Sequence, residues 1–149
     1  MPEVKQVRSV MLPLKDATLL LPHSALAEIV PEREITGLKN SAKWVAGTVS
    51  WNNGTIPLVL MEQALGLENS KVTSKHRLII VRCLGEAHGY RYLAIRTTGV
   101  PKLIQASDES VKIEKKNELK SEFVSFSCDV NGQLAFIPNM EKIEAKVVS

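Results

Sequence analysis

The residues of this chain that could do chemistry are few and widely separated. The three histidines are His23, His76 and His88, and no two of them lie four residues apart as metal ligands on a helix do. The chain contains no HExxH, GxSxG, P-loop or GxGxxG motif. His23 follows a predicted strand and His88 lies in a predicted turn, so both are expected to be exposed to solvent. The sequence therefore predicts no metal site and no cofactor.

The cysteines and lone carboxylates support the same conclusion. Cys83 and Cys128 are distant in sequence, neither belongs to a CxxC pair, and both lie in apolar stretches. They are interpreted as buried free thiols in a reducing compartment. Glu28 and Glu62 have no acid or base partner nearby in the sequence, whereas general acid–base catalysis needs groups held together in a cleft. We therefore expect a protein that is not an enzyme.

The composition is compatible with a binding protein. The chain has 149 residues, 44% of them hydrophobic, and a formal net charge of +3, which is too small to indicate nucleic acid by itself. One basic aromatic cluster, Tyr90–Arg91–Tyr92, keeps a small nucleic-acid-binding β-barrel as an alternative, which would need a basic groove and salt-sensitive binding. No apolar run approaches the roughly 20 residues that span a bilayer, and no signal peptide is evident, so a cytoplasmic protein without membrane insertion is expected.

Short apolar segments separated by turns predict an all-β protein. The segments 9–14 and 17–22 form one expected hairpin, and 123–130 and 133–138 form another around Asn131-Gly132. The segment 23–30 is expected to be a strand or a single turn, because prolines bracket it. Further strands are expected in 43–51, 55–60, 76–84 and 90–100, with short helical turns at 61–66 and 139–146.

Two polar segments interrupt this pattern. Residues 68–75, ENSKVTSK, are the best candidate for a connector between two halves of the chain. Residues 108–122 carry both charges and are interpreted as a solvated surface helix or loop, with a partner-binding site as the alternative. The apolar segment 76–84 reads as a strand that is buried on both faces.

The order of these segments resembles the CheW family of chemosensory adaptors, from about Ser9 to Ile143. The stretches that carry the resemblance are VMLPLKDATLLLPHSALAEIV, EITGLKNSAKWVAGTVSWNNGTIPLVLMEQALGL, HRLIIVRCL, YRYLAIRTTGV and VNGQLAFIPNMEKI. The resemblance implies a single CheW-like domain, 1–149, in which two small SH3-like five-stranded barrels pack on a shared core. It places approximate lobes at 1–70 and 71–149, between which strands may be exchanged. It also implies a non-enzymatic scaffold that couples the cytoplasmic tip of a chemoreceptor to the regulatory domain of a CheA-type histidine kinase.

The chain departs from the family at one turn. Family members usually carry Asn-Leu-Arg-Gly there, ending six positions after the glycine that opens the strand, whereas Gly54 lies seven positions after Gly47 here. The family's arginine falls at Asn52 or Asn53, and the Asp-Leu that ends the next strand is replaced by Leu60-Met61. Loss of both charges avoids leaving one unpaired. The chain is most similar to the ChpC-type branch of twitching-motility systems driven by type IV pili.

The resemblance places the receptor-facing surface at this turn and at the segment ALAEIV. The candidates carried over are Leu26, Glu28, Ile29, Gly47, Val49, Trp51, Asn52, Asn53 and Gly54. An aromatic beside a tight turn suits a binding hot spot, but Trp51 is equally open to a place in the core. Gly47 is expected to allow two backbones to approach closely, and Trp44 to belong to the core.

The kinase-facing surface is expected on the second barrel. Its candidates are Gly99, Val100 and Pro101, where the segment TTGVPKL ends a strand at a barrel rim. A CheW-like protein that has lost receptor binding and fills an assembly remains a further alternative, because the family's arginine is missing.

Overall fold

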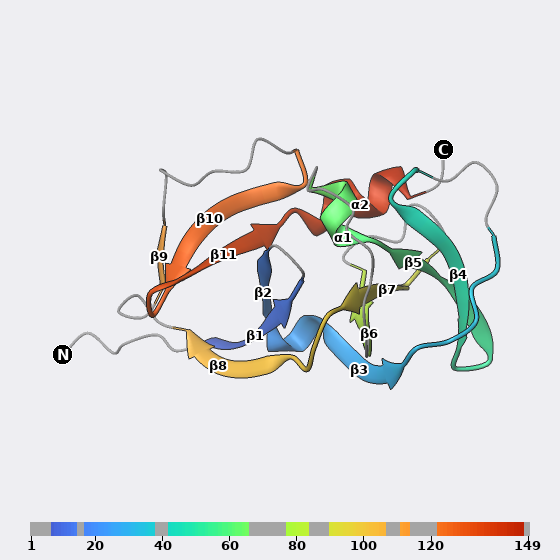
Figure 1. Ribbon diagram of the computed structural model, residues 1–149, viewed down its shortest axis with the longest axis horizontal. Coiled ribbons are helices and arrows are strands. Elements are labelled where there is room, and N and C mark those ends of the chain that lie inside the picture. The colour runs from blue at the N-terminus through green and yellow to red at the C-terminus, as the bar shows by residue number, and fades with distance from the viewer. Residues whose placement is uncertain are drawn as a thin grey trace.

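The computed structural model of the chain describes residues 7–14, 17–37, 42–65, 77–83, 90–106, 111–113 and 122–147. These residues form eleven strands, two short α-helices and one 3-10 turn, arranged as two sheets side by side (Figure 1). The predicted all-β class is confirmed. The connector 68–75, His76 and His88 lie outside the described residues, as does most of the charged segment 108–122.

The first hairpin forms as predicted and leads from one sheet into the other. Strand β1 (Val7–Pro13) pairs antiparallel with β2 (Thr18–Pro22), with Val10 opposite Leu21. Segment 23–30, predicted to be a strand or a single turn, contains both. The 3-10 turn η1 (His23–Ala25) is followed by the strand β3 (Leu26–Pro31). Pro22 precedes the turn with φ of −64°, the value to which the proline ring restricts it.

The first sheet has six strands rather than the five expected of each barrel. Its order is β8-β1-β2-β11-β10-β9, with β8 at Lys102–Ala106, β9 at Val111–Ile113, β10 at Val124–Val130 and β11 at Gln133–Pro138. The hairpin β10–β11 turns at Asn131 and Gly132, both with positive φ, as the sequence predicts. The strand β9 corrects the expectation of a helix or loop for the part of 108–122 that is described.

The second sheet has five strands in the order β3-β6-β7-β5-β4. Its members after β3 are β4 (Val45–Trp51), β5 (Gly54–Val59), β6 (Arg77–Arg82) and β7 (Tyr92–Thr97). The four central residues of β6 are all buried, which confirms a strand covered on both faces. Strands β3 and β4 lie at opposite edges of this sheet. Each sheet takes strands from both halves of the chain.

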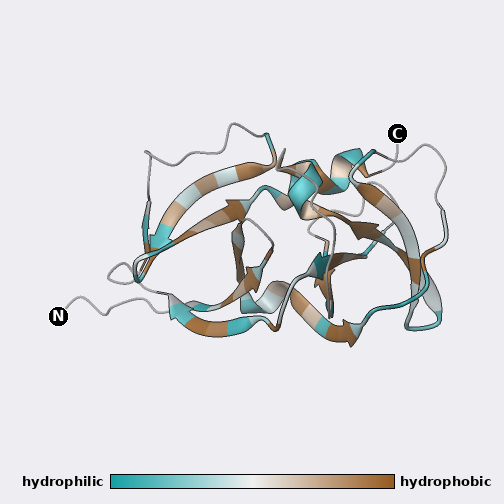
Figure 2. Cartoon of the chain, in the orientation of Figure 1, coloured by the Kyte–Doolittle hydropathy of each residue, from teal (hydrophilic) through white to brown (hydrophobic). Residues whose placement is uncertain are grey.

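A shared core joins the two sheets. The largest cluster of buried side chains combines Val10, Leu12 and Leu19 of the first sheet with Ile79, Leu93 and Ile95 of the second. The helices α1 (Met61–Ala64) and α2 (Met140–Lys146) lie where the sheets meet and add Met61 and Ile143 to this cluster (Figure 1). Figure 2 shows hydrophobic residues concentrated along the strands that form these cores. The shared core is thus confirmed.

Candidate functional site

The hairpin β4–β5 ends in a turn that is exposed to solvent. Asn52 and Asn53 both adopt a left-handed conformation, with φ of 51° and 64°, and Trp51 pairs with Gly54 across the turn. Two consecutive positive φ values match the twist of the flanking strands, and asparagine tolerates this conformation better than most residues. The two asparagines provide this conformation, and Gly54 begins β5.

Trp51 lies between the core and the surface. Its half-buried ring packs against the second core cluster and lies 4.7 Å from the Tyr92 ring, centroid to centroid. The indole Nε1 donates a hydrogen bond of 2.6 Å to Oε2 of Glu28. Because Glu28 is on β3 and Trp51 ends β4, this bond connects the two edge strands of the sheet. The side chain is therefore held in place from two sides.

Gly47 and Val49 lie within β4 and face its neighbours in the structure, a second backbone segment and the core. The φ of Gly47 is +144°, and a Cβ at this position would lie 2.2 Å from the carbonyl oxygen of Thr36. Thr36 exchanges two backbone hydrogen bonds with Thr48, at 2.9 and 2.7 Å, so the close approach of two backbones predicted at Gly47 is confirmed. Val49 is 1% exposed and packs in the core of its barrel, so any contribution to partner binding is indirect.

The three candidates on β3 differ in exposure. Leu26 is half-buried against the shared core, and its carbonyl oxygen accepts a hydrogen bond of 2.8 Å from Nη1 of Arg82. Glu28 is exposed and reaches Trp51. Ile29 is 43% exposed. The structure thus brings Glu28 to the hairpin tip, while Leu26 mainly contributes to packing.

Two residues at the hairpin were missed by the sequence analysis. Tyr92 was grouped with Tyr90 and Arg91 as a basic aromatic cluster, but it begins β7 and its ring contacts Trp51. Arg33, in the segment after β3, donates a hydrogen bond of 2.6 Å from Nη1 to the carbonyl oxygen of Ser50. Neither contact leaves a local trace in the sequence, because each joins segments that are far apart along the chain.

The candidate rim at residues 99–101 presents apolar surface. Val100 is 71% exposed, while Gly99 and Pro101 are half-buried. The segment is held in place because the backbone N–H of Thr98 donates a hydrogen bond of 3.0 Å to the carbonyl oxygen of Pro13. Nearby in the sequence, Leu103 on β8 is 64% exposed, so an apolar edge continues into that strand.

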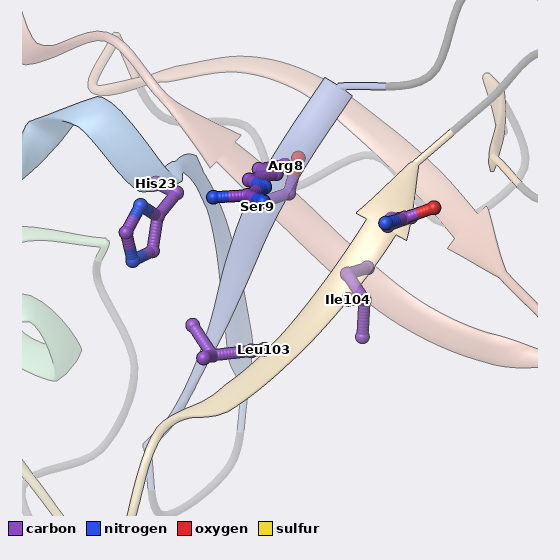
Figure 3. Close-up of a pocket in the computed structure, with 6 residues that line it drawn as sticks. Arg8, Ser9, His23, Leu103 and Ile104 are labelled. Atoms are coloured by element: carbon purple, nitrogen blue, oxygen red, sulfur yellow. The ribbon is translucent and has the colours of Figure 1, made fainter.

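A pocket of about 210 Å³ opens between η1, β1 and β8 (Figure 3). His23, which was expected to be solvent-exposed, is half-buried and lines this pocket with Arg8 on β1. Leu103 and Ile104 supply its apolar side. The pocket is smaller than typical sites for drug-sized ligands, at roughly 300–1,000 Å³. No three metal-ligating side chains come together within the described part of the chain.

The thiols are not set up as nucleophiles. Cys128 is buried and Cys83 half-buried, and both are free. Burial, with a smaller effect from Glu144, raises the pKa of Cys83 to about 12. Burial, followed by the charge of Asp129, also raises the pKa of Cys128. Because the thiolate is the reactive form, these environments disfavour thiol chemistry.

Comparison with known proteins identifies the family. A family model described as a CheW-like domain matches residues 8–147. The chain belongs to the CheW-like domain family. A search of curated proteins finds no significant match. Among solved structures, the crystal structure of the scaffolding protein TtCheW from Thermoanaerobacter tengcongensis aligns with a TM-score of 0.75 and 17% sequence identity, covering 91% of this chain and 90% of that chain.

The CheW-like fold agrees with the architecture predicted from the sequence. The two sheets correspond to two SH3-like barrels, and the similarity to TtCheW extends over both. At 17% identity the similarity establishes the fold alone. In the described part of this CheW-like chain, no helix is long and apolar enough to cross a membrane.

Proposed function

We propose that this CheW-like protein is a non-enzymatic adaptor that couples chemoreceptors to a CheA-type histidine kinase. The observation that carries the proposal is the family match over residues 8–147, which spans both barrels. The protein would act in the cytoplasm, recruited to receptor arrays, and the missing turn arginine favours the ChpC-type branch that serves twitching motility and type IV pili. No cofactor is needed for this role.

The receptor tip is proposed to bind at the β4–β5 hairpin and the neighbouring part of β3. The surface there combines a half-buried aromatic ring, Trp51, with the exposed polar groups of Asn52 and Asn53 and the partly exposed Ile29. Such a combination of an apolar anchor with polar neighbours is typical of protein–protein hot spots. A helical tip needs this kind of shallow apolar surface with a few polar contacts.

The regulatory domain of the kinase is proposed to bind at the rim formed by Gly99, Val100 and Pro101. Val100 at 71% exposure is the most exposed large apolar side chain of the described residues. With Leu103, which is 64% exposed three residues later, Val100 gives this edge the apolar character that a partner surface needs. The rim and the hairpin tip belong to different segments, so the two interactions can be tested separately.

The experiment measures binding of the purified protein to a receptor cytoplasmic tip and, separately, to a kinase regulatory domain from the same organism. Trp51→Ala should weaken receptor binding at least tenfold, since truncation of a hot-spot aromatic costs about 2 kcal/mol or more, and leave kinase binding unchanged. Val100→Ser should do the reverse. Circular dichroism checks that both variants fold. A third variant, Asn53→Arg, tests whether restoring the arginine that family members carry at this turn strengthens receptor binding.

Three results would change the proposal. Kinase binding without receptor binding would indicate a protein that fills assemblies and has lost the receptor contact. Binding to neither partner would show that the fold is shared without the function, and salt-dependent binding to single-stranded nucleic acid would then be measured. Equal loss of both interactions in each variant would show that the two surfaces are not distinct.

A further inference from the structure

The hairpin tip borders a shallow hollow whose lining includes one cationic side chain and no acidic side chain. Its lining consists of Arg33, Ser50, Trp51, Asn52, Asn53, Gly54 and Thr55, all in the described part of the chain. Arg33 reaches this hollow from the segment after β3, whereas the other residues belong to the β4–β5 hairpin. None of these lining residues carries a carboxylate, so the hollow has a single formal charge, which is positive.

The guanidinium of Arg33 has donors left for a partner. One hydrogen bond, from Nη1 to the carbonyl oxygen of Ser50, fixes the side chain against the hairpin. A guanidinium has five N–H donors in a planar fork. Of the neighbouring carboxylates, Glu32 binds Arg96 at 2.7 Å and Glu28 accepts from Trp51 at 2.6 Å. Glu34, which follows Arg33 in the chain, is exposed and does not line the hollow. Arg33 is thus held in position and open to an incoming anion.

The remaining walls of the hollow are also fixed in place. Asn52 and Asn53 are held in the left-handed turn, and Trp51 is held by Glu28 and Tyr92. The asparagine side chains offer amide donors, and the indole offers an apolar face beside them. Because the backbone of the turn and the Trp51 ring are positioned before a partner arrives, binding loses less conformational entropy.

We propose that this hollow is a carboxylate subsite that takes one Asp or Glu side chain from a partner protein. Arg33 binds the carboxylate through its free N–H groups, the amides of Asn52 and Asn53 add neutral donors, and Trp51 packs against the methylene groups of the acid. Charge complementarity selects an acidic side chain over a neutral amide. The identity of the partner as a receptor tip rests on the proposed function, whereas the chemistry of the subsite does not.

The first experiment measures affinity for the receptor tip with substitutions at Arg33. Arg33→Gln should weaken binding about tenfold, as expected for loss of one charged hydrogen bond, and should reduce the salt dependence of binding. Arg33→Lys should be intermediate, since it keeps the charge and loses the fork. Lys112→Gln, which removes the same charge from the exposed face of β9 in the other sheet, is the control and should change affinity less than twofold.

The second experiment tests the subsite without any receptor. N-acetylglutamate N-methylamide is titrated into the labelled protein, with the glutamine compound as its neutral counterpart, and nitrogen–proton spectra are recorded. The glutamate compound should give saturable shifts at the indole N–H of Trp51 and the amide of Asn53, and Arg33→Gln should abolish them. Trp44→Phe identifies the Trp51 indole, because the chain has two tryptophans.

The two experiments separate failure of the subsite from failure of the adaptor function. Equal shifts from the glutamate and glutamine compounds, or normal receptor binding by Arg33→Gln, would overturn the subsite and leave the adaptor function standing. Arg33-dependent shifts in a protein that binds no receptor tip would support the subsite and overturn the choice of partner.

Discussion

Replacing Gly47 with alanine tests how the edge strand β4 is held. The φ of +144° lies in a region nearly restricted to glycine, and holding a residue with a side chain there costs about 1–3 kcal/mol. The new Cβ would lie 2.2 Å from the carbonyl oxygen of Thr36, which is backbone and cannot rotate away as a side chain can. The two hydrogen bonds between Thr36 and Thr48 would then weaken, at about 0.5–1.5 kcal/mol each. We expect Gly47→Ala to lower the free energy of unfolding by about 2–6 kcal/mol, out of about 5–15 kcal/mol for a typical domain.

Two other glycines provide matched controls for this substitution. A Cβ at Gly37 would meet nothing within 4 Å and its φ is not positive, so Gly37→Ala should stay within about 0.5 kcal/mol of wild type. Gly132 has a φ of +89° with open space around it, so Gly132→Ala should cost about 1–2 kcal/mol from conformation alone. Urea unfolding followed by circular dichroism measures all three. A Gly47→Ala protein no less stable than Gly132→Ala would refute the argument from steric contact.

Three further predictions concern titration and capping. Burial raises the pKa of Cys83 from 9.0 to about 12, so its contribution to the free energy of unfolding is fully present below pH 9 and is lost as the pH rises toward 12. Cys83→Ala should therefore flatten the alkaline decline of this free energy in urea unfolding, and an unchanged decline would contradict the argument. Lys146 lowers the pKa of the exposed carboxyl of Glu122 chiefly through a hydrogen bond, so Lys146→Met should raise that pKa toward 4.5 in a carbon-detected NMR titration, whereas Lys142→Met should raise it less. The side chain of Asn139 accepts a hydrogen bond of 3.2 Å from the backbone N–H of Lys142 and caps α2; Asn139→Ala should therefore cost about 1 kcal/mol of thermal stability, while Asn139→Asp should cost little.

The local chemistry of the sequence determined the strands and the tight turns. The apolar segment around β6 is buried on both faces, and Asn131-Gly132 forms the expected hairpin turn. Asn139 before a short amphipathic segment marks the start of α2. These features depend on backbone preferences and on the spacing of apolar residues, which act within a few residues of each other. The ordered set of segments was also sufficient to indicate the CheW-like family.

Only the tertiary structure decided which distant segments meet. Strand β2 lies beside β11 and β5 beside β7 in parallel pairs, and the six-stranded sheet gains β9 from a segment whose charges suggested a helix or loop. Trp51 meets Glu28, and Arg33 meets Ser50, because the five-stranded sheet curves until its two edge strands approach. Tyr92 meets Trp51 from β7, two strands away in the same sheet. Such contacts depend on the burial of whole sheets and on edges that remain unpaired, so no local pattern of residue types encodes them. The hairpin was therefore visible in the sequence, whereas the side chains that surround its tip were not.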